Sequence, residues 1–166
     1  TGQEIIDTIP DVNAFVSGIG TGGTLMGVGK RLKDYNSNSK VIALEPSTLS
    51  ILKMGMEEGS HMIEGIGDDF IPGIVDKDLI DVIVLIDDLD AINMAKRIAK
   101  EFGLGIGISS GANFLASVIM DNSDLKIATV FPDDNKKYIT TKLSEEIDEN
   151  PELLSNKIKL ISMKVI

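Results

Sequence analysis

With 166 residues, the chain is long enough for one hydrophobic core and too short for two sizeable domains. Its apolar residues are mainly aliphatic (43% hydrophobic, 4% aromatic, no Trp), which favours a parallel sheet covered by helices. A net charge of -10 disfavours nucleic acid and anionic membranes as partners, and the absence of Cys excludes disulfides, a thiolate nucleophile and a cysteine-based zinc cluster.

The first part of the chain predicts a helix, a strand and a second helix. A short helix is expected over residues 1–8, because Pro10 disfavours helical geometry just before it. A buried strand follows around Phe15 and Val16. After a glycine loop, helix resumes at Thr24. Its apolar residues recur at three- and four-residue spacing: Leu25, Val28, Leu32 and Tyr35.

The glycine loop between that strand and helix predicts an anion site. Four glycines free its backbone to turn and expose N–H groups, and Thr21 and Thr24 add hydroxyl donors. Because a helix N-terminus carries unpaired N–H groups and a positive dipole end, the loop suits a small phosphate. The alternative is a tight packing turn, since the loop has neither P-loop spacing nor a G-x-G-x-x-G pattern.

Strands and helices alternate through most of the remaining chain, which is the pattern of βαβ units. The further predicted strands are 41–44, 81–86, 126–131 and, as an edge or added strand, the stretch 158–165. The further predicted helices are 49–58, a helix capped by Asp87 or Asp88 and reaching Phe102, a helix from the 107–113 turn to about 120, and 138–147. Pro46 and Pro132 are expected to stop strand pairing. Ligands of such sheets bind beyond the carboxyl ends of the strands, where the glycine loop and the 132–134 turn would both lie.

Five segments resemble, in order, a known family. They are T-G-Q-E-I at 1–5, G-T-G-G-T at 20–24, the H-x-I-x-G-I-G-x-x-F-I-P segment at 61–72, G-I-S-S-G at 107–111 and the P-D-x-x-x-K-Y-x-x-T segment at 132–141. The family is the cysteine synthase and cystathionine β-synthase group of pyridoxal-phosphate enzymes, of the tryptophan synthase β-like fold type II. The similarity extends to about residue 143.

The resemblance implies a fold and a cofactor. The fold is an α/β three-layer structure, a mostly parallel sheet with helices on both faces, forming an incomplete large domain of a tryptophan synthase β-like enzyme. We expect residues 1–150 to form the cofactor-phosphate-binding domain; residues 151–166, which lie beyond the resemblance, are expected to be a C-terminal extension with an edge strand because of their alternating pattern. The cofactor would be pyridoxal 5'-phosphate. Its phosphate would be held by Gly20, Thr21, Gly22, Gly23 and Thr24.

The resemblance also implies which residues contact the ring of the cofactor and the substrate. Ser109 would hydrogen-bond the pyridine nitrogen, and a neutral hydroxyl there suits loss of a β-substituent without transamination. From the residues alone, Ser109 also reads as the N-cap of the following helix. Gly65 and Gly67 would lie against the cofactor edge and the substrate amine, since glycine allows close backbone contact. Lys137 and Tyr138 would help to close the floor of the site.

The implied reaction is synthesis of L-cysteine from O-acetylserine and sulfide, and this chain would be the C-terminal part of the enzyme. The alternatives are a sulfide-releasing cysteine lyase and a cystathionine β-synthase. Asp68 and Asp69 depart from simple cysteine synthases, so Asp69 is a candidate catalytic residue acting on a thiol or water. Its alternative is a solvated loop carboxylate. His61, the single histidine, is read as structural.

One required residue is missing. The family's Schiff-base lysine stands in an S-x-K-D/N-R setting, and none of the lysines here does. We therefore expect a fragment that is inactive by itself, with no catalytic lysine and no metal. The non-enzyme alternative is a module that binds a phosphorylated metabolite. The expected partners are a small amino-acid substrate and, in the complete enzyme, a second copy or a separate N-terminal chain, in the cytoplasm.

Overall fold

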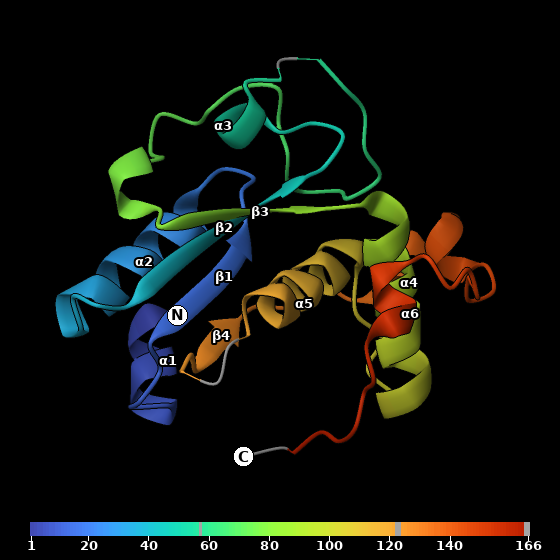
Figure 1. Ribbon diagram of the computed structural model, residues 1–166. Coiled ribbons are helices and arrows are strands. Elements are labelled where there is room, and N and C mark those ends of the chain that lie inside the picture. Colours follow the sequence, from blue (N-terminus) through green and yellow to red (C-terminus); the bar gives the residue numbers. More distant parts are fainter. Residues whose placement is uncertain (57, 122–123, 165–166) are drawn as a thin grey trace.

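A computed structural model describes residues 1–56, 58–121 and 124–164. Its centre is a four-stranded, fully parallel sheet in the order β3-β2-β1-β4 (Figure 1). The strands are β1 (Ala14–Gly18), β2 (Lys40–Pro46), β3 (Val82–Ile86) and β4 (Ile127–Thr129). The sheet confirms the α/β class that the aliphatic composition predicted.

Helices cover both faces of the sheet, which confirms the three-layer arrangement. The α-helices are α1 (Gly2–Thr8), α2 (Gly23–Tyr35), α3 (Ile51–Met54), α4 (Asp88–Phe102), α5 (Ile108–Met120) and α6 (Leu154–Lys157). Helices α1 and α2 lie on one face, and α4 and α5 on the other (Figure 1). Within the described residues, no helix combines the length and apolar character needed to cross a membrane.

The two faces have separate cores. Phe15 and Val41 pack with Leu25 and Leu32 of α2, whereas Val16 and its neighbours in the sheet pack against α4 and α5. Because successive side chains of a strand point to opposite faces, a strand covered on both sides must be apolar throughout. This explains the uninterrupted apolar runs in the sequence.

Two expectations in the first half of the chain are wrong. Pro46 does not stop pairing: it lies in register with Ile86, and the next amide, that of Ser47, donates to the Ile86 carbonyl at 2.9 Å. The helix expected over 49–58 is reduced to α3, because Gly55 adopts a left-handed φ of 67° that ends it. Residue 57 of that expected helix lies outside the described residues. Tyr35, the last residue of the predicted helical spacing, ends α2; it is 48% exposed, and its hydroxyl donates to the Pro10 carbonyl.

Two expectations near the C-terminus are also wrong. The helix expected over 138–147 is replaced by 3₁₀ turns at Asn135–Tyr138 and Lys142–Ser144, since Thr141 has an extended backbone in the middle of that range and its hydroxyl caps the second turn by accepting from the Leu143 amide. In place of the expected edge strand, the described residues 151–164 contain α6 and coil. Arg97 of α4 donates to the Ile158 carbonyl at 2.8 Å, so this segment is held by a side chain rather than by a sheet edge. Residue 165 of the expected strand lies outside the described residues.

The topology brings the predicted loops together. Strands β1 and β4 are neighbours, with Val16 opposite Thr129. The glycine loop leaves the carboxyl end of β1, and the 132–134 turn leaves that of β4. Both loops therefore lie beyond the carboxyl ends of the strands, as the sequence predicted.

Candidate functional site

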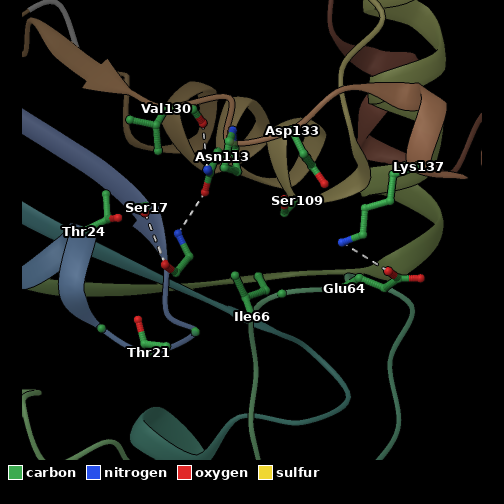
Figure 2. A pocket seen from close by; sticks show the side chains of 15 residues that line it. Ser17, Thr21, Thr24, Glu64, Ile66, Ser109, Asn113, Val130, Asp133 and Lys137 are labelled. Carbon is green, nitrogen blue, oxygen red and sulfur yellow. Dashed lines mark hydrogen bonds and ion pairs between the residues drawn. The ribbon is translucent and has the colours of Figure 1, made fainter. Parts of the chain in front are cut away.

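A cavity of about 350 Å³ lies at the carboxyl ends of β1 and β4 (Figure 2). It is bounded by the glycine loop, the turn at 64–66, the start of α5 and the segment after β4. Its lining includes Ser17, Gly18, Gly20, Thr21, Gly22, Thr24, Glu64, Gly65, Ile66, Ser109, Asn113, Val130, Pro132, Asp133 and Lys137. The volume falls in the range of small-molecule sites, and the lining comes from four separate parts of the sequence.

One end of the cavity is built for an anion. Helix α2 begins at Gly23, and neither a side-chain cap nor an acidic residue occupies its first turn. The N–H groups there are free to bind a ligand, and the helix dipole favours negative charge. Gly22 has a φ of 84°, which a side-chain-bearing residue rarely adopts. The loop conformation therefore depends on glycine at this position.

The glycine loop is in backbone contact with the turn that faces it. A Cβ atom added to Gly20 would stand 2.3 Å from the Gly65 carbonyl oxygen. Only glycine allows this approach, so the two turns form one wall of the cavity.

Ser109 lies at the other end of the cavity, in the first turn of α5. The N-cap of α5 is Gly107, and no side chain caps the helix, so the interpretation of Ser109 as a cap is wrong. Ser109 is buried and lines the cavity. The Gly107 amide donates to the Asp133 carbonyl at 3.0 Å, which holds this turn against the segment that follows β4.

Asn113 is a site residue that the sequence reasoning missed. Its Oδ1 accepts from the Gly18 amide and its Nδ2 donates to the Val130 carbonyl, each at 2.9 Å (Figure 2). One buried amide thus connects α5 to the carboxyl ends of β1 and β4. The available signal was an Asn one helical turn after Ser109, on the same face of the helix.

The mouth of the cavity carries an ion pair. Lys137 Nζ lies 3.5 Å from Glu64 Oε2, and both side chains are about half exposed (Figure 2). Below it, the buried Tyr138 hydroxyl donates to the Asp133 carboxylate. Burial and the hydrogen bond to Asp133 raise the pKa of Tyr138, so this phenol stays protonated and keeps donating.

The structure brings together most of the predicted site residues. Those that line the cavity are Gly20, Thr21, Gly22, Thr24, Gly65 and Ser109. Gly23 starts α2 just behind the lining. Gly67 supports the opposite turn from outside, with a φ of 74° and its amide donating to the Ile19 carbonyl at 2.9 Å. Asp69 is exposed on the loop and lies outside the lining.

These features define an α/β protein that can hold a small phosphorylated ligand between a helix N-terminus and a neutral hydroxyl. A family profile described as "Pyridoxal-phosphate dependent enzyme" matches residues 1–133. The chain belongs to this family of pyridoxal-phosphate dependent enzymes.

Individual relatives agree with the resemblance seen in the sequence. The chain is 42% identical over 146 residues to cysteine synthase B of Campylobacter jejuni, covering 86% of this chain and 48% of the relative. A crystal structure of a hydrogen sulfide-producing enzyme from Fusobacterium nucleatum is 46% identical, covers 99% of this chain and 51% of that one, and has a TM-score of 0.91. For O-acetylserine sulfhydrylase isoform 3 of Entamoeba histolytica, the identity is 34%, the shares are 94% and 47%, and the TM-score is 0.83.

The chain spans about half the length of the curated relatives it matches. Its cavity nevertheless fits the family's cofactor. Pyridoxal phosphate carries an anionic phosphate at one pole and a ring nitrogen at the other. The cavity offers uncapped N–H groups of α2 at one end and the Ser109 hydroxyl at the other. The backbone contact at Gly20 holds the glycine loop against Gly65 along one wall of the cavity.

Proposed function

We propose that this chain is the cofactor-phosphate-binding part of an enzyme that makes L-cysteine from O-acetylserine and sulfide. In that reaction the C–O bond to acetate breaks and a C–S bond forms at the same carbon. The cysteine synthase relatives support this activity. The observation that carries it is the cavity itself, because it joins the anion-binding start of α2 to Ser109.

Each group in the cavity has a proposed role. The N–H groups at the start of α2, from Gly22 to Thr24, and the hydroxyls of Thr21 and Thr24 bind the phosphate. The Ser109 hydroxyl bonds the pyridine nitrogen. The bound cofactor supplies an electron sink, which a neutral partner at the nitrogen leaves milder than a carboxylate would. Gly20 and Gly65 form the wall against which the cofactor lies.

A sulfide-releasing activity is the second candidate. Two observations favour it: the similarity to the hydrogen sulfide-producing enzyme and the adjacent acids Asp68 and Asp69. In this proposal Asp69 acts on the incoming or leaving thiol or water, moving a proton as a general acid or base. In the complete enzyme, Asp69→Asn should lower sulfide release from cysteine by at least about tenfold. Asp68→Asn, an equally exposed neighbour, is the control, and equal turnover of both variants and the wild type would remove Asp69 from the mechanism.

Product analysis distinguishes the candidate reactions. The complete enzyme is supplied with O-acetylserine plus sulfide, with cysteine alone, and with serine plus homocysteine. Cysteine as the main product, with acetate released, supports the proposed synthase. Faster sulfide release from cysteine supports the lyase, and formation of cystathionine from serine supports the third candidate, cystathionine β-synthase.

The non-enzyme alternative is a module that binds a phosphorylated metabolite. The missing lysine motif favours it, whereas the convergence of the cofactor motifs on one cavity opposes it. We expect this chain to bind pyridoxal phosphate without the visible absorbance of a covalent lysine adduct. The adduct should appear when the missing part of the enzyme is supplied. A homodimeric complete enzyme in the cytoplasm, acting on a small amino acid, completes the proposal.

A further inference from the structure

The single histidine holds the turn that faces the glycine loop. His61 Nε2 lies 2.9 Å from the Gly67 carbonyl oxygen. A carbonyl oxygen can only accept, so Nε2 must carry the hydrogen of this bond. The neutral ring therefore has its lone pair on Nδ1.

Gly67 is held from both sides. Its carbonyl accepts from His61, and its amide donates to the Ile19 carbonyl at 2.9 Å. A Cβ atom added to Gly67 would stand 2.7 Å from Pro46 Cγ and 2.9 Å from His61 Nε2, so only glycine fits between Pro46 and His61. The two residues before Gly67 are Gly65 and Ile66, which line the cavity. The position of this wall thus depends on His61.

Asp88 fixes the segment that carries His61. It is 8% exposed, at the start of α4, and its Oδ2 accepts from the amide of Met62 at 2.8 Å. Among the described residues, the buried atoms without a hydrogen-bond partner include Asp88 Oδ1 and His61 Nδ1. Burial raises the pKa of Asp88, while the Met62 amide and the charge of His61 lower it. The charge of Asp87 also raises the pKa of Asp88, and the charge of Lys142 lowers it.

We propose that His61 is a positioning residue of the cofactor site: its Nε2–H clamps the Gly67 carbonyl, and Asp88 anchors the clamp through the Met62 amide. The inference rests on the proposed function, since it assigns His61 to the wall of the same cavity. His61 touches neither the cavity nor a ligand; it acts through the 65–67 turn.

Because the chain contains one histidine, its imidazole gives a single set of nitrogen resonances. In the wild-type chain without cofactor, we expect the Nε2–H tautomer for the neutral ring and slow amide exchange at Gly67. His61→Ala should speed Gly67 exchange and weaken pyridoxal phosphate binding, each by about tenfold. His61→Gln, whose amide group can donate to the same carbonyl, should stay within about threefold of the wild type in Gly67 exchange.

A second variant tests the anchor. Asp88→Asn keeps an oxygen for the Met62 amide, so it should preserve Gly67 protection, whereas Asp88→Ala should reduce it. An Nδ1–H tautomer, or Gly67 exchange unchanged in His61→Ala, would overturn the clamp. The His61 tautomer and the Gly67 amide exchange are measured without cofactor. They therefore test the hydrogen bond between His61 and Gly67 even if the wild-type chain fails to bind pyridoxal phosphate. That failure would count against the proposed function instead.

Discussion

Gly20→Ala tests whether the contact between the two turns determines the site. The added methyl carbon would lie 2.3 Å from the Gly65 carbonyl oxygen, 0.7 Å closer than the 3.0 Å limit that real Cβ contacts respect. Both partners belong to backbone, so no side-chain rotation can relieve the overlap. Overpacking of this kind costs about 1–3 kcal/mol, and we expect Gly20→Ala to lower the free energy of unfolding by about 2 kcal/mol. The displaced wall should also weaken pyridoxal phosphate binding by about tenfold or more.

Urea unfolding and equilibrium binding measure the two effects. Gly27→Ala is the matched control, because Gly27 lies in α2 with nothing within 4 Å of an added Cβ. Replacing an exposed helical glycine with alanine should raise stability by about 0.5–1 kcal/mol. If Gly20→Ala matched Gly27→Ala in both stability and binding, the turns would not be in the contact described, and the argument for a shared wall would fail.

Three further predictions follow from the contacts around the cavity. Asn113→Ala leaves the Gly18 amide and the Val130 carbonyl unpaired and should cost about 2–3 kcal/mol of unfolding free energy in urea titrations; a loss well below 1 kcal/mol would contradict the bridging role. Lys137→Ala removes a half-exposed ion pair and should change thermal stability by less than about 1 kcal/mol, and a larger loss would show that Glu64 needs this partner. Burial raises the pKa of Asp88 above its ordinary 3.8, so the native state keeps this proton to higher pH than the unfolded chain does. Stability from this group is therefore lost as the pH rises through the raised pKa; Asp88→Asn should gain stability relative to the wild type as the pH rises from 3.8 through that raised pKa, and a pH-independent difference in unfolding titrations would refute the assignment.

Local signals were sufficient for the elements that bind the phosphate. The apolar run at β1, the glycines after it and the helical spacing of Leu25, Val28 and Leu32 are each written in adjacent residues, and each was predicted. Local signals misled where a distant partner decides the conformation. Arg97 of α4 holds the Ile158 carbonyl, 61 residues further along the chain, in a segment that alternation suggested was a strand.

The sequence by itself determined the α/β class, the anion-binding loop and the family, because these depend on composition, periodicity and short motifs. Only the tertiary structure decided which residues hold the cavity in shape. Asn113 bonds to residues 95 positions before it and 17 after it, and His61 reaches Gly67 only because the intervening loop folds back on itself. Such contacts have no sequence period, since they arise from where parallel strands end and which loops the sheet places side by side.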